Sequence, residues 1–562
     1  MEKSDNKMIL RIRENTFTAQ FSGGNESVFL KGTTLLDILK HHRPPEKETV
    51  VLAKVNQRLC SLQQSIDEDC TIEWVPTPSL EGTRAYQQTL CLILIRAVLE
   101  LYPHQKLLID HSLGKGLFCR LQHKRAISLW TVKKIKKRMM EIIQSNESIQ
   151  PVTLSREQAA ERFRLNGEKD TLLLGNQEQF RFTFYQSGGV LDFFDHPLLS
   201  STNRVQTFDL RPWPPGMILN FIETSSQNLP PFIKQKKLFR VFHEYGRWES
   251  ILKIQKAADI NEASESGEIL DLVKIAEGLH EKKIAHIADT ITKKKKIIRI
   301  VLISGPSSSG KTTFTKRLGI QLRVNGLKPL MISLDDYFLN REQTPRTANG
   351  DYNYESPEAI DILQLNRDLQ SLLAGETVPL PHYDFKLGKR LPGATRHLES
   401  HQPILIEGIH GLNDQITPSI SRNNKLKIYI SALTQLNITD HTRVPTSDVR
   451  LLRRLIRDYQ FRNYSPEHTI ERWPLVRLGE EKNIFPFQEE ADIMFNSSLI
   501  YELPVLREMV KPLLERVPPT HAAFFEAQRL ILLLLFFLPL SPNEVPSNSI
   551  LREFIGRSSF DY

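Results

Sequence analysis

The chain has 562 residues, of which 40% are hydrophobic and 25% are charged, an ordinary composition for a globular protein. This length predicts several domains, roughly three or four. The net charge of +9 suits phosphate-bearing ligands or nucleic acid but is diffuse, so it does not select between them. The most apolar run, residues 530–538, is too short to span a bilayer and precedes a proline, so we expect a buried helix and no membrane contact.

The cysteines and the first residues predict a cellular compartment. Cys60, Cys70, Cys91 and Cys119 form no C-x-x-C pair, so we expect free thiols in a reducing, cytoplasmic environment. Residues 1–5 contain no signal-peptide core. Nothing in the sequence predicts an oligomeric state.

The first domain, residues 1–78, is expected to be small and rich in strands. A helix is predicted at 33–39, capped by Thr33 or Thr34. Strands are predicted at 8–12 and 16–21, which would form a hairpin, and at 50–55 and 70–75. This β-β-α-β-β order resembles the TGS domain, a ubiquitin-like β-grasp fold attached to threonyl-tRNA synthetases and some GTPases. The resemblance implies an interaction module.

The second domain, residues 82–240, resembles the α+β editing domain that follows TGS in threonyl-tRNA synthetases. The stretches that carry the resemblance are 84–90, 97–103 and 111–118. The family opens this domain with an H-x-x-x-H pair that helps to hydrolyse mischarged tRNA, whereas this chain has Tyr86 and either Thr89 or Leu90. Hydrolysis needs a general base or a metal-bound water, so we predict a domain without editing activity. His111 is either a structural residue or a stray metal ligand.

Two further segments precede the nucleotide-binding region. Residues 131–140 predict a basic helix with the apolar stripe Val132, Ile135 and Met139, and its lysines either face solvent or contact RNA. Residues 241–296 predict a helical connector, because apolar residues recur at helical spacing from 269 to 291.

A phosphate-binding loop follows the strand predicted at 297–303. The loop, called the phosphate loop below, has the G-x-x-x-x-G-K-[ST] pattern and consists of Gly305, Pro306, Ser307, Ser308, Ser309, Gly310, Lys311, Thr312 and Thr313. A helix that stops at Asn325-Gly326 is predicted after it. The backbone N–H groups and the helix dipole would hold phosphates, Lys311 would reach the β- and γ-phosphates, and Thr312 would bind Mg²⁺. The pattern predicts ATP or GTP binding.

Carboxylates end the next predicted strands. The run 329–334 leads into Asp335 and Asp336, the run 402–406 ends at Glu407, and a fourth strand is predicted at 425–431. A carboxylate at a strand end beside a phosphate loop is well placed for Mg²⁺ or a substrate hydroxyl. A helix then carries five arginines, which would grip phosphates: Arg450, Arg453, Arg454, Arg457 and Arg462.

These ordered motifs resemble the uridine kinase and phosphoribulokinase family over residues 297–500. The resemblance implies a P-loop kinase with a parallel sheet and an arginine lid, ATP and Mg²⁺ as cofactors, and a small nucleoside-like substrate. It implies that Asp335 is the base that accepts the proton of the acceptor hydroxyl and, with Thr312 and Glu407, belongs to the Mg²⁺ shell. It implies that Glu355 holds the ribose hydroxyls and that Tyr383 packs on the nucleobase. It also implies that Arg454 binds the substrate and that Arg457 and Arg462 bind the phosphates.

The residues themselves leave alternatives open, and some depart from the family. Asp335 could cap a helix, Glu407 could be a surface acid, Tyr383 could belong to the core, and the arginines could face solvent. The family histidine after the Tyr383-Asp384-Phe385 stretch is replaced by residues 388–390, which read Gly-Lys-Arg. The phosphoryl-transfer residues are present, and the residues that read the base differ.

We therefore expect an ATP-dependent kinase of a nucleoside, with uridine or cytidine phosphorylated at the 5′-hydroxyl. One alternative is an RNA-binding or regulatory protein in which nucleotide binding is a switch, and another is a kinase of a different sugar-like alcohol. The expected overall class is α/β for the kinase domain, residues 297–500. Residues 501–562 predict a helical extension with no assigned chemistry.

Overall fold

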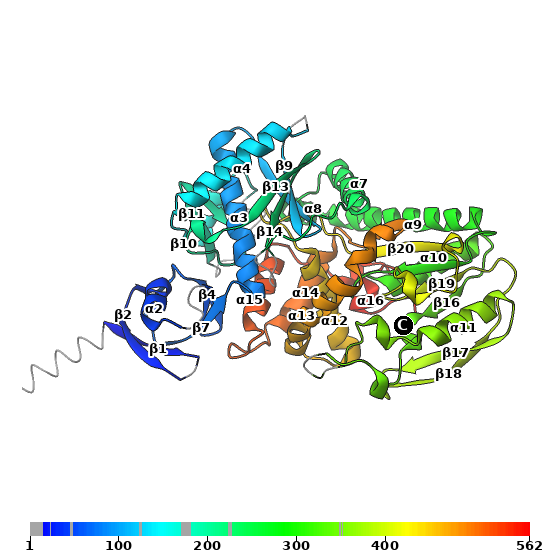
Figure 1. Cartoon of the computed structure of the whole chain (residues 1–562). Coiled ribbons are helices and arrows are strands. Elements are labelled where there is room, and N and C mark those ends of the chain that lie inside the picture. Colours follow the sequence, from blue (N-terminus) through cyan, green and yellow to red (C-terminus); the bar gives the residue numbers. More distant parts are fainter. Residues whose placement is uncertain are drawn as a thin grey trace, which may run out of the picture.

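The computed structural model describes the chain except for a few short segments. The described residues are 15–22, 24–44, 49–122, 126–169, 181–222, 228–347, 350 and 352–562. The strands of the N-terminal half lie at one end of the molecule and the sheet of the phosphate loop lies at the other, with helices between them (Figure 1).

The first region is a five-stranded mixed sheet with one helix on it. In spatial order the strands are β2 (Glu26–Leu30), β1 (Thr16–Phe21), β7 (Cys70–Pro76), β4 (Val50–Val55) and β5 (Arg58–Ser61). The central pair β1 and β7 is parallel, and the other pairs are antiparallel. Helix α2 (Leu35–His42) buries its apolar side on this sheet, and a short pair, β3 (Thr33–Thr34) and β6 (Ser65–Ile66), flanks the helix.

The local predictions for this region are partly right. Thr34 caps α2, because its hydroxyl accepts a hydrogen bond from the backbone N–H of Asp37. Strand β1 pairs with β2 on one side and with β7 on the other. The predicted strand at 8–12 lies outside the described residues.

The second region surrounds a long buried helix, α3 (Leu80–Leu101), which packs against α4 (Leu129–Gln144). Its four-stranded sheet has the order β13 (Phe208–Trp213), β14 (Gly216–Phe221), β9 (Gly116–Leu121) and β8 (Leu107–Leu113). A second sheet contains β10 (Gln150–Leu154), β11 (Phe182–Ser187) and β12 (Val190–Phe193), and α5 (Arg156–Leu165) lies between its first two strands in sequence.

Tyr86 and Thr89, at the positions where the resemblance would place imidazoles, hold this second region together. The Tyr86 hydroxyl donates to the carbonyl of Thr207 at 2.7 Å and accepts from the N–H groups of Gln206 and Thr207. The Thr89 hydroxyl accepts from the N–H of Leu199 at 2.9 Å. Both side chains are therefore structural, because each satisfies backbone groups in the interior.

The basic helix has the predicted apolar stripe, and several of its charges are paired. Val132, Ile135 and Met139 are buried on α4. Lys136 pairs with Asp209, and Arg138 pairs with Glu100 and Glu141. These pairs favour the solvated interpretation of the helix, and RNA contact stays a prediction.

The connector consists of three helices, α7 (Lys236–Leu252), α8 (Ala257–Ser266) and α9 (Ile269–Lys293). It begins a few residues before the predicted start at 241. The apolar repeat from 269 to 291 forms the buried side of α9, which packs against the helix of the phosphate loop. The prediction of a packed connector is confirmed.

The phosphate loop belongs to a five-stranded sheet in which every pair is parallel. In spatial order the strands are β16 (Leu330–Ser333), β19 (Ile404–Glu407), β15 (Ile300–Ser304), β20 (Lys425–Ser431) and β21 (Ile493–Asn496). The strand predicted at 425–431 has these bounds in the structure, whereas β21 was not predicted. A parallel sheet brings the carboxyl ends of β15, β16 and β19 to one edge.

Helices cover both faces of this sheet because its strands are apolar on both sides. Val301 and Ile303 of β15 pack with α9 and α10 (Lys311–Val324) on one face. Ile300 and Leu302 pack with α11 (Ile362–Leu373) on the other. An antiparallel hairpin, β17 (Val378–Asp384) and β18 (Lys389–Arg396), flanks α11 (Figure 1).

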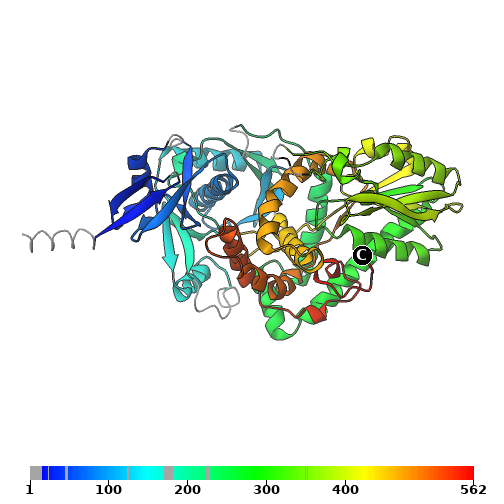
Figure 2. The same cartoon turned by 90° about the horizontal axis from the view of Figure 1, so that it is seen from below.

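The remaining helices lie between the kinase-like sheet and the N-terminal half, as both Figure 1 and Figure 2 show. They are α12 (Thr446–Arg462), α13 (Pro466–Asn483), α14 (Glu502–Leu514), α15 (Phe524–Leu535) and the short α16 (Arg552–Ile555). Helix α15 contains most of the apolar run 530–538 and is buried, as predicted.

Candidate active site

The phosphate loop turns tightly between β15 and α10, and its glycines are needed for geometry. A Cβ on Gly305 would lie 1.9 Å from the carbonyl oxygen of Ile430, so only glycine fits there. Gly310 has φ of +84°, which a side chain would strain. The Lys311 ammonium donates to the carbonyl of Pro306 at 3.2 Å, which holds it over the loop.

Two buried arginines hold the loop from the side of α12. Arg450 donates to the carbonyl of Ser307 at 2.9 Å and pairs with Glu480 of α13. Arg453 donates to the carbonyl of Ser308 and pairs with Glu502. The Glu480 carboxylate in turn accepts from the N–H of Ser307 at 3.0 Å. The arginine pattern alone does not set these two apart from the other three, although their spacing of three places them on one side of a helix.

The other arginines of α12 gather around one carboxylate. Arg454, Arg457 and Arg462 all lie within ion-pair distance of Asp458, and Arg454 also donates to the Ser307 hydroxyl at 2.9 Å. The solvated interpretation is wrong for Arg450 and Arg453, which are 1% and 0% exposed. Helix α12 thus turns Arg450 and Arg453 into the interior, and neither belongs to the three lid arginines that the family resemblance implies.

Asp335, in the turn after β16, and Glu407, the last residue of β19, both lie beside Lys311. Burial raises the pKa of the Glu407 carboxyl to about 7, against the effect of Lys311 and with Asp335 and Glu553 raising it further. Glu407 also accepts a hydrogen bond from the Thr312 hydroxyl at 3.1 Å. Burial likewise raises the pKa of Asp335, while the nearby Lys311, Arg462 and Arg457 lower it. The structure thus brings together Lys311, Thr312, Asp335 and Glu407.

Asp335 and Asp336 point to different places. Both lie in the 3-10 turn Leu334–Tyr337 that follows β16, so they are not on the strand itself. The Asp336 carboxylate contacts the His382 ring at 3.0 Å and accepts from the N–H of Tyr383. Asp336 therefore holds strand β17, whereas the Asp335 carboxylate faces Lys311. Ser333, not Asp335, caps the turn, so the capping alternative for Asp335 is wrong.

The two predicted substrate residues lie in different surroundings. Glu355 lies against Gly479 of α13, and burial together with Glu480 raises its pKa to about 7, while Arg454 and Lys311 lower it. It is thus part of the same charged group. Tyr383 is only 2% exposed, and its ring makes T-shaped, edge-to-face contacts with the rings of Phe338 and Phe385. This packing favours the core interpretation of Tyr383 over base stacking.

The donor set fits a magnesium ion with a nucleotide. Mg²⁺ is held in proteins by one or two carboxylates together with hydroxyls, waters and substrate phosphates. The Thr312 hydroxyl and the Glu407 and Asp335 carboxylates supply such oxygens beside the loop. Among the described residues no group of three or more His, Cys, Asp or Glu side chains is placed to hold a metal by itself.

Comparison with known proteins identifies a family that matches residues 300–500. The model of the "Phosphoribulokinase / Uridine kinase family" matches residues 300–500. The chain is 32% identical over 196 residues to a uridine kinase of Bacillus pumilus, covering 35% of this chain and 84% of that protein. It is 31% identical over 197 residues to a uridine kinase of Chloroflexus aurantiacus, covering 35% of this chain and 85% of that one.

The chain belongs to the phosphoribulokinase and uridine kinase family. It is an ATP-dependent phosphotransferase. A solved structure of a possible uridine kinase from Bacillus stearothermophilus matches 38% of this chain and 98% of its own, with 23% identity and a TM-score of 0.26. The described helices include none long and apolar enough to cross a membrane.

A relative of a different class also matches the chain. The chain is 26% identical over 196 residues to a threonine–tRNA ligase of Finegoldia magna, covering 34% of this chain and 31% of that protein. The chain spans about a third of the length of that ligase.

Proposed function

We propose that the chain transfers the γ-phosphate of ATP to the 5′-hydroxyl of uridine or cytidine. The observation that carries the proposal is the convergence of Lys311, Thr312, Asp335 and Glu407 at the carboxyl ends of β15, β16 and β19. The similarity to uridine kinases over residues 300–500 supports a nucleoside as the acceptor.

Each side chain would have one task in the transfer. Asp335 would accept the proton of the acceptor hydroxyl, and its raised pKa makes it a better base than an exposed carboxylate. Lys311, Arg457 and Arg462 would neutralise the charge of the phosphates, and Arg454 and Glu355 would hold the substrate. Thr312, Glu407 and Asp335 would hold Mg²⁺, which supplies charge neutralisation between the β- and γ-phosphates when bound.

A second candidate is a kinase of another sugar-like alcohol. Tyr383 is enclosed by aromatic rings and does not present an open face for a base. The residues after it, 388–390, also lack the histidine that the uridine kinases carry. Both observations concern recognition of the nucleobase, and neither affects the residues that transfer the phosphoryl group.

We also propose the remaining organisation of the chain from its resemblances. Residues 1–78 would be a TGS-like β-grasp module, and the parallel pair β1 and β7 at the centre of its sheet supports this. Residues 82–240 would be an editing-like domain without activity, residues 241–296 the connector, residues 297–500 the kinase and residues 501–562 its extension.

A phosphorylation screen tests the proposal directly. The purified chain is given ATP, Mg²⁺ and separate panels of nucleosides and sugar alcohols, and the phosphorylated product is measured. We expect transfer to uridine and cytidine, and a loss of about 10²- to 10³-fold in kcat for Lys311→Ala. Transfer only to a non-nucleoside alcohol would favour the second candidate. A Lys311→Ala variant with wild-type turnover would contradict the phosphate-loop assignment.

A further inference from the structure

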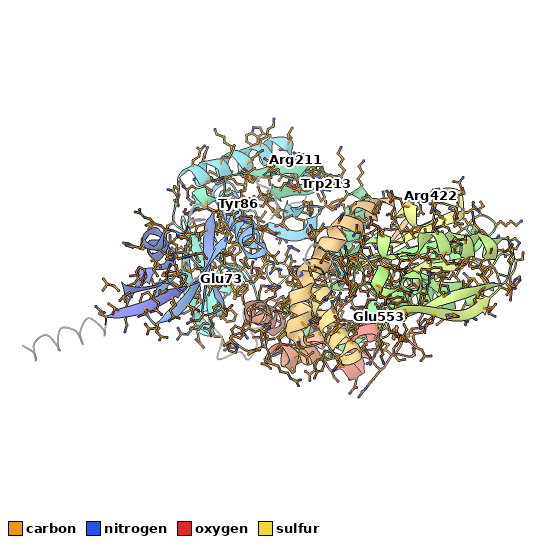
Figure 3. All side chains as sticks on the ribbon, turned by 60° about the horizontal axis from the view of Figure 1, so that its bottom comes forward. Glu73, Tyr86, Arg211, Trp213, Arg422 and Glu553 are labelled. Atoms are coloured by element: carbon orange, nitrogen blue, oxygen red, sulfur yellow. The ribbon has the colours of Figure 1, made fainter. Side chains whose placement is uncertain are left out.

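A carboxylate from the far end of the sequence occupies the phosphate loop. Glu553 of α16 lies beside the helices and strands of the kinase sheet in Figure 3. Its Oε2 accepts a hydrogen bond from the backbone N–H of Thr313 at 3.0 Å and another from the Thr313 hydroxyl at 2.8 Å. Some 240 residues of sequence separate these two partners, so the contact depends on the tertiary fold.

The N–H that Glu553 occupies is one that the loop uses for anions. Thr313 is the third residue of α10, and the next residue, Phe314, already donates to the carbonyl of Gly310. The Thr313 N–H therefore has no acceptor within its own helix, and such groups at a helix N-terminus bind phosphate. In a loop of this pattern the backbone N–H groups cradle the α- and β-phosphates.

The backbone that carries Glu553 is fixed against the loop. Ile550, Leu551 and Phe554 are fully buried, and the guanidinium of Arg453 lies 5.2 Å from the centre of the Phe554 ring. The Ile550 side chain lies 2.3 Å from the place where a Cβ on Gly310 would be. The carboxylate is thus presented to the loop by a buried element.

Two further groups from the same segment approach α10. The Tyr562 hydroxyl lies 2.7 Å from the Thr313 hydroxyl, and the Lys316 ammonium donates to the carbonyl of Asp561. Tyr562 is 60% exposed, so these outer contacts can separate more easily than the buried part of the segment. Thr313 is therefore held by Glu553 and Tyr562 together.

We propose that Glu553 is an internal phosphate mimic, which competes with the nucleotide for Thr313 and so inhibits nucleotide binding. The proposal rests on the proposed function only in requiring a nucleotide at the phosphate loop. One N–H cannot serve a carboxylate and a phosphate together, and the two anions also repel each other. Nucleotide binding must then move Glu553 and Tyr562 off Thr313. The ligand that displaces them is a nucleoside di- or triphosphate.

The test compares ADP binding by calorimetry in the full-length chain and its variants. Glu553→Gln keeps the size of the side chain and removes its charge. Its amide oxygen accepts the Thr313 N–H more weakly than the carboxylate does, so we expect ADP to bind about tenfold more tightly. Adenosine, which has no phosphate, should bind as it does to the wild type. Glu544→Gln is the matched control, because Glu544 is an exposed acid in the same C-terminal region. It should leave the ADP affinity unchanged.

A second arm separates competition from a general charge effect. A field acting through solvent is screened over about 3 Å at 1 M salt, so its contribution would vanish there. Competition for one N–H predicts that the ratio of the two affinities, Glu553→Gln over wild type, persists at 1 M salt. Loss of that ratio would overturn the proposal, and so would equal or weaker ADP binding by the variant.

The wild-type chain provides a measurement without substitutions. If ADP displaces the segment, amide hydrogen exchange in residues 556–562 should become faster when ADP is added, and unchanged or slower exchange would overturn the proposal. If Lys311→Ala abolishes ADP binding but Glu553→Gln does not bind ADP more tightly than the wild type, only this inference is contradicted. Absence of ADP binding in all variants would contradict the proposed function as well.

Discussion

Two neighbouring carboxylates after β16 have separate tasks. Asp335 faces Lys311 and the arginines, whereas Asp336 holds His382 and the backbone of Tyr383. We expect Asp335→Asn to lower kcat by about 10²-fold or more, the usual contribution of a positioned general base. ATP affinity should change little, because Lys311 and the loop remain.

Asp336→Asn is the matched control for that substitution, with the same change one residue away. An amide can still accept from the Tyr383 N–H, so we expect a much smaller loss of kcat. Both variants are measured for kcat and for nucleotide affinity. If Asp336→Asn proved the more damaging, the acceptor would have to lie on the hairpin side of the turn.

The raised pKa of Glu407 should make the stability of the folded protein depend on pH. Burial raises its pKa from 4.5 to about 7 in the folded protein. A raised folded-state pKa contributes stability that is complete below about pH 4.5 and is lost as the pH rises through about 7. The nucleotide-free Glu407→Gln variant should therefore have a higher Tm than the wild type at pH 8 and a similar Tm at pH 4.5.

The same substitution should reduce activity. Loss of a metal-shell group costs at least about tenfold in metal affinity or activity. Thermal unfolding at the two pH values and a kinase assay test both statements. A Glu407→Gln variant that is less stable than the wild type at pH 8 would show that Glu407 is a structural acid.

At the scale of elements, α12 and α13 fix the phosphate loop through a buried ion pair. Glu480 contacts Arg450 and accepts from Ser307, and its side chain is 0% exposed. Glu480→Gln leaves Arg450 without its charge partner, so we expect the free energy of unfolding to fall by about 3–5 kcal/mol. Nucleotide affinity should fall too, because the loop loses a support.

Glu481, the next residue of α13, is the control for Glu480. It is 40% exposed and pairs with Lys115 at 3.0 Å. A surface pair contributes about 0–1 kcal/mol, so Glu481→Gln should scarcely change the urea unfolding midpoint. Equal effects of the two substitutions would contradict the view that burial gives Glu480 its importance.

The sequence predicted the elements whose signals are local. The phosphate loop with its strand and helix, the Lys425–Ser431 strand and the acids at the strand ends follow from patterns within about ten residues. The burial of Arg450 and the place of Glu553 depend on partners 30 and 240 residues away. No periodicity encodes such contacts, so the loop supports and the role of α16 required the structure.

At the scale of the whole molecule, the kinase and the synthetase-like region interlock. The backbone of Asp440 accepts from the N–H of Ile109 on β8, and the Asn437 amide donates to the Ile109 carbonyl. His441 contacts Asp192 at 2.5 Å. Polar and charged contacts thus connect the kinase region to the N-terminal half in a buried part of the molecule. The two halves are therefore packed together and not joined only by a flexible linker.

The interlocked synthetase-like region should have no editing activity. Its Tyr86 and Thr89 hold backbone groups, and His111 is buried with its ring stacked on Phe242 at 3.8 Å. Burial lowers the pKa of His111 to about 3, and the described residues contain no cluster that could hold a zinc ion. His111 therefore cannot act as a base near neutral pH, and among the described residues no cluster can hold a metal-bound water.

The full-length chain should therefore leave mischarged threonine tRNA intact. We expect deacylation within about twofold of the uncatalysed rate, since general acid–base catalysis alone would add about 10²-fold or more. Release of the amino acid is measured with and without the chain, with added Zn²⁺ as a further condition. Tyr86→His with Thr89→His cannot restore activity by itself, because both positions support backbone. Hydrolysis by the wild-type chain would show that another group in the N-terminal half activates water.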